Sequence, residues 1–317
     1  MSERKIVSAF APASVGNLGV GFDMLGLAVE GVGDIVTANR CEVKGVHILK
    51  IEDAYGNIHT SLSSNPDENT ASIAAKSLWD KENNQGGVEL VLKKGIPLCS
   101  GMGSSAASAV AAVVAVNSLL EEPLSKADLL EHALVGEEFA SKGIHADNVA
   151  PSLFGGLVLC PTVTLPNVVE LPVPDDLSCV LIHPELEVNT AESRRGLAKE
   201  YELSSWITQQ GYFGSFLAAC FTGDAELFKT SLRDEIIEPQ RKNAVPCFTK
   251  VKEAVLEQGV LGCSLAGSGP SIFAICNSSQ SEDISIIMLD ICDEMGYPAE
   301  SWISPLNATG AFVLNEL

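Results

Sequence analysis

The chain has 317 residues, of which 46% are hydrophobic, and its 41 acidic and 20 basic side chains give a formal net charge of −21. This length and apolar content exclude a disordered chain and allow a sizeable core in one large domain or two. The acidic balance disfavours binding to nucleic acid or to an anionic membrane surface, because both rest on basic side chains that neutralise phosphate.

The cysteines are nine in number and scattered singly, without a CxxC pair or a Cys/His cluster. An odd, dispersed set is typical of free thiols in a reducing compartment and argues against a disulfide framework or a zinc site. The apolar stretch 6–11 is too short for a signal peptide. We therefore expect a cytoplasmic protein.

Residues 95–120 contain no charged side chain and are long enough to cross a bilayer. The segment consists mostly of Ala, Gly and Ser and includes Asn117, and such residues gain little on transfer to hydrocarbon. The composition therefore favours a helix buried against a sheet over a membrane span.

Short strands and helices alternate along the first half. Apolar alternation predicts strands over 6–11, 25–29, 34–39, 46–51 and 88–93. Helical spacing predicts helices over 70–80, 104–120 and 126–141. Four prolines between residues 158 and 176 then mark a connection between two halves.

The second half has the same α+β character and no internal repeat. Strands are predicted over 179–183, 262–265, 271–276 and 310–314. Helices are predicted over 191–201, 213–228, 248–258 and 283–295.

A glycine-rich segment, residues 97–107 (PLCSGMGSSAA), lies between a predicted strand and a predicted helix. Its glycines can turn sharply and aim backbone N–H groups at an anion, to which the helix N-terminus adds its positive dipole end. A P-loop is excluded because no Lys follows the glycines. A dinucleotide site needs a strand ending in Asp or Glu about twenty residues later, where this sequence has helix. A tight turn capped by serines remains the alternative.

The same segment resembles the phosphate loop of the GHMP small-molecule kinases, with Met102 where Leu is common. Further segments resemble that family in its order along the chain: 11–26 (APASVGNLGVGFDMLG), 145–151 (HADNVAP), 154–156 (FGG), 189–194 (NTAESR) and 265–271 (LAGSGPS). The resemblance implies a two-domain α+β fold, with an N-terminal domain like domain 2 of ribosomal protein S5 over residues 1–160 and a ferredoxin-like C-terminal domain over 161–317. It also implies ATP-dependent phosphorylation of an alcohol, Mg²⁺ as cofactor and, by family habit, a homodimer.

By this resemblance, the nucleotide contacts one group of residues: Pro97, Ser100, Gly101, Met102, Gly103, Ser104, Ser105, Ala106, Ala107 and, near the adenine, Asn69. Ser105 and Glu137 would hold Mg²⁺, which takes one or two protein oxygens and keeps its waters. The neighbouring Glu138 is equally acidic, and spacing alone does not separate the two. Asn69 and the serines could instead be simple helix caps.

An amino-acid alcohol is a zwitterion, and its pocket needs a cation, an anion and a polar group near the hydroxyl. The resemblance assigns Arg194 and Arg241 to the carboxylate, a task that suits the planar guanidinium. It places the other substrate-binding residues around the ammonium, backbone and hydroxyl: Asn17, Asp23, His145, Asn148 and Thr190. Arg194 could also be a surface helix residue, and His145 a loop or core residue.

The group that faces the reacting hydroxyl is Asn148 or its neighbour Asp147. In several relatives an aspartate at the position of Asp147 is thought to act as a base. Because neighbours on an extended or irregular segment face different ways, we expect Asn148 to orient the hydroxyl and Asp147 to be structural. A kinase for another alcohol such as mevalonate, a nicotinamide-dependent oxidoreductase and a binding module without catalysis remain as alternative functions.

Overall fold

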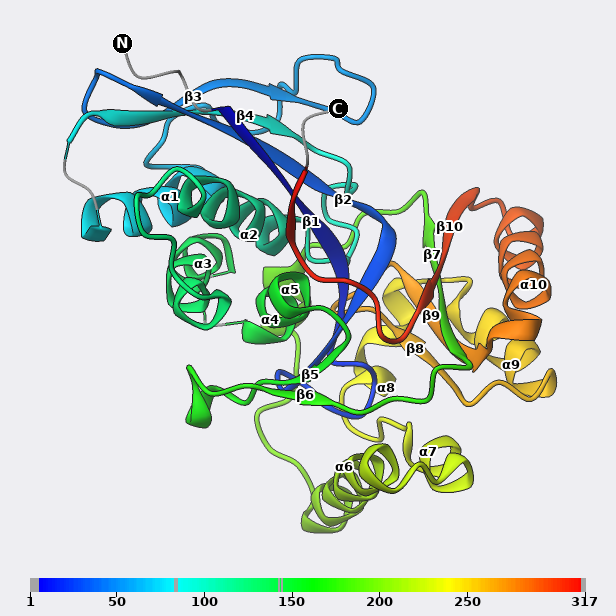
Figure 1. Ribbon diagram of the computed structural model, residues 1–317. Coiled ribbons are helices and arrows are strands. Elements are labelled where there is room, and N and C mark those ends of the chain that lie inside the picture. Colours follow the sequence, from blue (N-terminus) through cyan, green and yellow to red (C-terminus); the bar gives the residue numbers. More distant parts are fainter. Residues whose placement is uncertain (1–5, 83–84, 142, 144, 315–317) are drawn as a thin grey trace.

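The computed structural model describes residues 6–82, 85–141, 143 and 145–314, and Figure 1 shows the arrangement of their elements. One sheet has the strand order β11-β1-β2-β4-β3, and β5 and β6 extend it from β2. Its strands are β1 (Ile6–Gly16), β2 (Leu25–Cys41), β3 (Gly45–Glu52), β4 (Gly87–Lys93), β5 (Leu157–Leu159), β6 (Val169–Leu171) and β11 (Phe312–Leu314).

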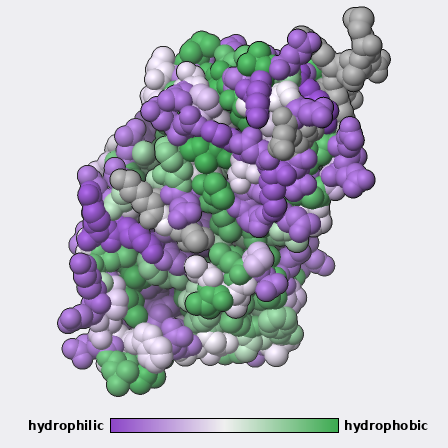
Figure 2. All heavy atoms as spheres, turned by 90° about the vertical axis from the view of Figure 1, so that its left-hand side faces the viewer, coloured by the Kyte–Doolittle hydropathy of each residue, from purple (hydrophilic) through white to green (hydrophobic). Residues whose placement is uncertain are grey.

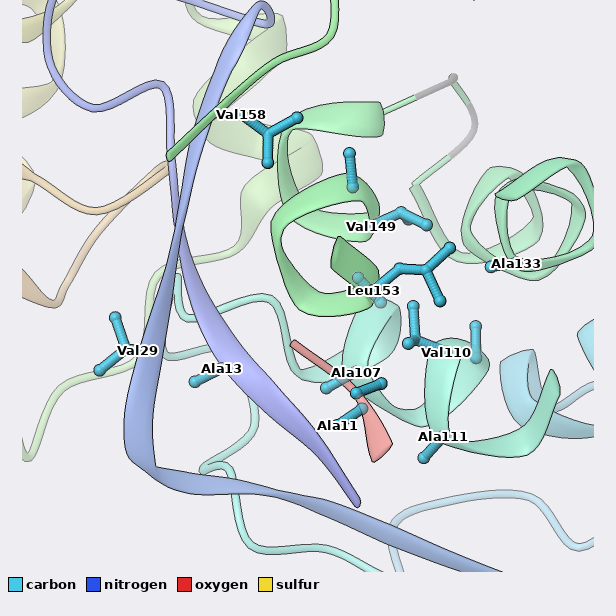
Figure 3. Packing of buried hydrophobic residues seen from close by; sticks show 14 of the residues in the cluster. Ala11, Ala13, Val29, Ala107, Val110, Ala111, Ala133, Val149, Leu153 and Val158 are labelled. Carbon is cyan, nitrogen blue, oxygen red and sulfur yellow. The ribbon is translucent and has the colours of Figure 1, made fainter. Parts of the chain in front are cut away.

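Four helices pack together beside this sheet: α1 (Thr70–Glu82), α2 (Ser104–Asn117), α3 (Lys126–Ser141) and α4 (Ala146–Phe154). Every residue of α2 from Ala106 to Asn117 is buried, so the charge-free segment forms a central helix. Its small Ala and Val side chains allow close approach, and Figure 3 shows Ala107 and Val110 among residues of β1, β2 and α4. Within the described residues, no helix is long and apolar enough to cross a membrane.

The second sheet is antiparallel, with the order β10-β7-β9-β8. It comprises β7 (Leu177–Pro184), β8 (Gly262–Leu265), β9 (Ile272–Asn277) and β10 (Ala299–Pro305), and it packs with α9 (Phe248–Glu257) and α10 (Ser281–Glu294). Helix α9 precedes β8 and α10 precedes β10, which gives the ferredoxin-like arrangement that the family resemblance implied.

The helices α5 (Thr190–Arg195), α6 (Leu203–Thr222), α7 (Ala225–Ser231) and α8 (Glu238–Arg241) lie between β7 and α9 in the chain. The part of the chain that the structure describes also contains three short 3₁₀ turns: η1 (Thr162–Thr164), η2 (Lys242–Ala244) and η3 (Ser278–Gln280). Figure 1 shows α6 and α7 as a pair that projects away from both sheets.

Several predicted elements need correction. The strands expected at 25–29 and 34–39 form the single strand β2, because a bulge opposite Pro12 and Ala13 accommodates the residues between them. The helix expected over 213–228 begins at Leu203 and is divided at Gly223, whose left-handed backbone ends α6. The helix expected over 191–201 ends at Arg195. Strands β5, β6 and β10 and the helix α4 were not predicted.

The two sheets do not separate cleanly at residue 160, the boundary expected from the sequence. Strand β6 lies after that boundary and pairs with β5, and β11 near the C-terminus pairs with β1. The chain thus returns to its first sheet, and buried residues of both halves share one hydrophobic cluster. This shared core fixes the two halves relative to each other around the site described next.

Candidate active site

A cavity of ≈ 420 Å³ lies where the glycine-rich loop, α3, α4, α5 and the β8–β9 turn meet. Most of the residues predicted for the site line it: Asn17, Asp23, Asn69, Ser100, Gly101, Gly103, Ser104, Ser105, Glu137, His145, Asp147, Asn148, Thr190, Arg194 and Arg241. Met102, Ala106 and Ala107 belong to the same segment but are fully buried and do not line the cavity. Pro97, at the start of the loop, is half-buried and also lies outside the lining.

The glycine-rich loop leads directly into the N-terminus of α2. Gly103 occupies the N-cap in a left-handed conformation, and it has no side chain that could accept from the first N–H groups of the helix. Those groups and the helix dipole are therefore available to an anion in the cavity. Helix α2 is followed by α3 rather than by a strand, so the expected obstacle to a dinucleotide site is confirmed.

The turn between β8 and β9 packs against this loop. The backbone N–H of Ser271 donates to the carbonyl of Ser100 at 3.2 Å. Gly101 has a φ of 78°, and a Cβ at this position would lie 2.5 Å from the carbonyl oxygen of Ala266. The segment 265–271 therefore supports the glycine-rich loop from the other half of the chain, and any side chain at residue 101 would push the two segments apart.

Glu137 faces the cavity from α3 and is buried, whereas Glu138 is exposed. The hydroxyl of Ser105 donates to Glu137 Oε2 at 2.6 Å. Burial raises the pKa of Glu137 to about 7, and the nearby Asp147 acts in the same direction. The structure thus separates two glutamates that the sequence left equivalent.

Ser105 and Glu137 fit a magnesium site in their chemistry. Both offer hard oxygen atoms, they are in contact, and Ser105 lies in the first turn of α2, beside the N–H groups available to a phosphate. Among the described residues, no group of three or more His, Cys, Asp or Glu side chains could hold a metal ion. The arrangement therefore suits an ion bound jointly by the protein and a phosphate, not one held by protein ligands alone.

Asp147 and Asn148 lie in the first turn of α4, not on the extended segment expected from the sequence. Both side chains line the cavity, so the expectation that only one of them could face it is wrong. The helical backbone places neighbours about 100° apart rather than on opposite faces. Asn148 Oδ1 accepts from the hydroxyl of Ser14 at 3.0 Å, and burial raises the pKa of Asp147 to about 7.

Charged side chains gather at the other end of the cavity. Arg194 pairs with Asp23 through both terminal nitrogens, and Nδ1 of His145 lies 3.7 Å from Asp23 Oδ1. Arg241 is buried and donates to the carbonyl of Gly267 at 2.8 Å, and among the described residues its Nε has no hydrogen-bond partner. Two cations and one carboxylate at one place have the charges that a zwitterionic ligand would need.

Hydrogen bonds hold other residues of the cavity lining in place. The amide of Asn17 donates to the carbonyl of Gly267 at 3.1 Å, and its Oδ1 accepts from the backbone N–H of Asp23. The hydroxyls of Thr190 and Ser268 lie 3.1 Å apart. Asn69 caps α1 by accepting from the N–H of Ala71, and it also lines the cavity, so the cap is confirmed and the contact with adenine stays a prediction.

Sequence reasoning missed Phe22, which lies under both arginines. The guanidinium carbons of Arg194 and Arg241 are 5.4 and 5.3 Å from the centre of its ring. This stacking holds two like charges beside each other. Lys94 and Ser108, also in the cavity lining, were missed as well, although a lysine directly after a buried strand was a visible signal.

Comparison with known proteins agrees with this geometry. The model of the GHMP kinases N terminal domain matches residues 69–156, and the model of the GHMP kinases C terminal domain matches residues 216–285. A homoserine kinase of Xanthomonas campestris pv. campestris (strain B100) is 40% identical over 307 residues, which cover 96% of this chain and 93% of that protein. A homoserine kinase of Chlorobium phaeobacteroides (strain BS1) is 39% identical over 322 residues, covering 98% and 100%. The chain belongs to the GHMP kinase family.

Solved structures show the same likeness. The crystal structure of homoserine kinase from Cytophaga hutchinsonii ATCC 33406 has a TM-score of 0.93 and 39% identity, and 99% of each chain is covered. Galactokinase from Lactococcus lactis has a TM-score of 0.68 at 17% identity, covering 98% of this chain and 95% of that one, and shares the fold alone. The two-domain GHMP kinase fold expected from the sequence is therefore confirmed.

Proposed function

We propose that the protein is a homoserine kinase, which transfers the γ-phosphate of ATP to the hydroxyl of L-homoserine and yields O-phospho-L-homoserine for threonine biosynthesis. The observation that carries this proposal is the pairing, in one cavity, of a phosphate-binding helix N-terminus with a zwitterion site built from Asp23, Arg194 and Arg241. Relatives about 40% identical over nearly the whole chain are homoserine kinases.

In the proposed complex, homoserine separates the ions that now neutralise each other. Its carboxylate accepts from Arg194 and from Arg241, and its ammonium donates to Asp23. Asn17, His145, Asn148 and Thr190 border the rest of the substrate. Mevalonate carries a carboxylate but no ammonium, and it would leave Asp23 without its partner, so the charge pattern favours the amino alcohol.

Phosphoryl transfer passes through a loose transition state in which side chains do little covalent work. The protein therefore contributes mainly by positioning the reactants. The loop from Ser100 to Ser105 and the first N–H groups of α2 hold the phosphates of ATP. Ser105 and Glu137 would hold a magnesium ion, which when bound would offset the negative charge of the phosphates. Asn148 holds the acceptor hydroxyl in line.

The proton of that hydroxyl leaves late in a loose transfer, so a base adds little. Asp147 therefore serves in this proposal as a structural neighbour of Asn148, whose Nδ2 lies 3.4 Å from Asp147 Oδ1. The same aspartate has a pKa of about 7, which is the property that a base would need. Kinetics of its asparagine variant decide between the two roles.

The substrate assignment is tested by an ADP-release screen with MgATP and a panel of alcohols: L-homoserine, homoserine amide, mevalonate and galactose. L-Homoserine should give the highest kcat/KM, and omission of Mg²⁺ should abolish the release. Faster turnover of mevalonate or galactose would show that the assigned substrate is wrong. Ligand binding without any ADP release would instead identify a binding module.

The assembly and the location of the protein belong to the same proposal. Helix α6 contains no charged residue over its 20 positions and exposes Leu203, Trp206, Ile207 and Phe221. Figure 2 shows apolar surface at the lower end of the molecule, the end where Figure 1 places α6. Since each copy carries a charge of −21, an uncharged face is where two copies would meet, and this supports a homodimer.

The nine cysteines support a cytoplasmic location. All of them are free thiols, and most are buried in apolar surroundings. Burial raises the pKa of Cys220 and Cys263 to about 12, which keeps these thiols protonated and inert.

A further inference from the structure

Beneath the glycine-rich loop lies a buried ion pair between Asp34 of β2 and Lys94, the residue that follows β4. Their side chains are 1% and 5% exposed. A buried pair is costly to desolvate and is weak evidence for stability by itself. The hydrogen bonds that Asp34 and Lys94 form with other residues indicate the role of the pair instead.

The carboxylate of Asp34 binds both ends of the loop. Its Oδ1 accepts from the backbone N–H groups of Gly95 and Ile96 at 3.0 and 3.2 Å, at the point where the chain enters the loop. Its Oδ2 accepts from Lys94 and, at 2.6 Å, from the hydroxyl of Ser108 in the first turns of α2. The Asp34 side chain thus links the two ends of the glycine-rich loop.

Lys94 completes the closure from the strand side. Its ammonium donates to Asp34, to the carbonyl of Ser104 at 2.9 Å and to the hydroxyl of Ser108 at 2.6 Å, so its three protons all have partners within the protein. Gly95 allows the close approach, because a Cβ there would lie 2.1 Å from the carbonyl oxygen of Gly33.

We propose that the Asp34–Lys94 pair is a positioning device that sets the geometry of the phosphate loop and hence the affinity for ATP, without contacting the nucleotide. The inference rests on the proposed nucleotide site. The backbone N–H donors of a phosphate-binding loop must match the positions of the phosphate oxygens. A shift of one end of the loop therefore weakens several of these hydrogen bonds together. Homoserine is bound mainly by residues on other elements, and its binding should depend little on this pair.

The test compares Asp34→Asn, Lys94→Met, the double variant Asp34→Asn/Lys94→Met and Ser108→Ala by steady-state kinetics in MgATP and by thermal unfolding. Each variant at Asp34 or Lys94 should raise the KM for ATP about tenfold and leave the KM for homoserine within about twofold. Ser108→Ala, which keeps the ion pair, should show a smaller rise. Val255→Ala, a cavity variant in the core of the second half, controls for lost stability alone.

The double variant distinguishes a positioning role of the pair from a merely structural one. It leaves no unpaired buried charge, so its Tm should recover towards that of the wild type while its KM for ATP stays raised. A KM for ATP that recovers together with the Tm would show a merely structural pair and overturn the proposal. So would a KM rise in Lys94→Met tenfold larger than in Asp34→Asn, because that result would place the ammonium on the nucleotide itself. Turnover by the wild-type protein tests the kinase function separately.

Discussion

Glu137 and Glu138 are adjacent and chemically identical, yet only Glu137 faces the cavity and contacts Ser105. We expect Glu137→Ala to lower kcat at saturating substrates by about a hundredfold, because it removes one of two protein oxygens offered to magnesium. Glu138→Ala is the matched control and should change kcat little. Equal losses in the two variants would remove Glu137 from the metal site.

Asp147 gives the protein a pH dependence of stability whose sign follows from its burial. Its pKa rises from 3.8 to about 7 on folding, so between these values the folded state holds more protons than the unfolded state. Stability contributed by this residue is therefore lost as the pH rises towards 7, at up to about 1.4 kcal/mol per pH unit. Urea unfolding should show Asp147→Asn gaining stability relative to the wild type at pH 8 compared with pH 5. An equal difference at both values would contradict the assigned pKa.

The same variant reports on the mechanism. If Asn148 orients the hydroxyl and no base is needed, Asp147→Asn should retain most of its activity and its pH–rate profile, whereas Asn148→Ala should lose most of its kcat/KM. A large loss of kcat in a well-folded Asp147→Asn, together with loss of the acidic limb of the profile, would make Asp147 the base.

Arg194 and Arg241 should act on the substrate carboxylate. Replacing either with Ala should raise the KM for homoserine, with less effect on ATP, since a hydrogen bond to a charged group contributes about 1.5–3 kcal/mol. Homoserine amide, which lacks the negative charge, should lose its disadvantage in these variants. Unchanged discrimination between the acid and the amide would show that the arginines bind something else.

At the scale of elements, the exposed apolar face of α6 is the surface on which the proposed homodimer rests. Ile207→Glu places a charge in its exposed apolar face and should shift the molar mass measured by light scattering from that of a dimer towards that of a monomer, owing to the cost of burying an unpaired charge. Val163 is 93% exposed in η1, and Val163→Glu is the control that should leave the mass unchanged. A wild-type chain that is monomeric at all concentrations would exclude the homodimer.

The predictions from sequence succeeded where the signal was local. Helix α3 has the predicted limits, and β4 and α9 differ from prediction by one residue at one end. The signals for these elements, apolar spacing and caps, come from residues that are close in the sequence. The predictions failed where contacts between residues far apart in the sequence determine the local structure. The bulge that joins 25–29 to 34–39 depends on β1, and the first turn of α4 depends on packing against β1 and β2. The left-handed Gly223 was a visible stop signal that the prediction overlooked.

At the scale of the whole molecule, the candidate site could be assembled from the sequence only through its family resemblance. Composition predicted the buried α2, but not the Asp34–Lys94 pair, whose members are 60 residues apart in the chain. Nor could spacing predict Phe22 beneath two arginines from the second half. Such contacts arise only when both halves pack on one core.

The central claim is that this cavity joins the terminal phosphate of ATP to the hydroxyl of homoserine. The most direct measurement is ³¹P NMR of a reaction containing the protein, MgATP and L-homoserine. We predict the appearance of a phosphate monoester resonance, coupled to the protons of the homoserine side-chain terminus, in step with conversion of ATP to ADP. Formation of inorganic phosphate alone, or no change in ATP, would contradict the account.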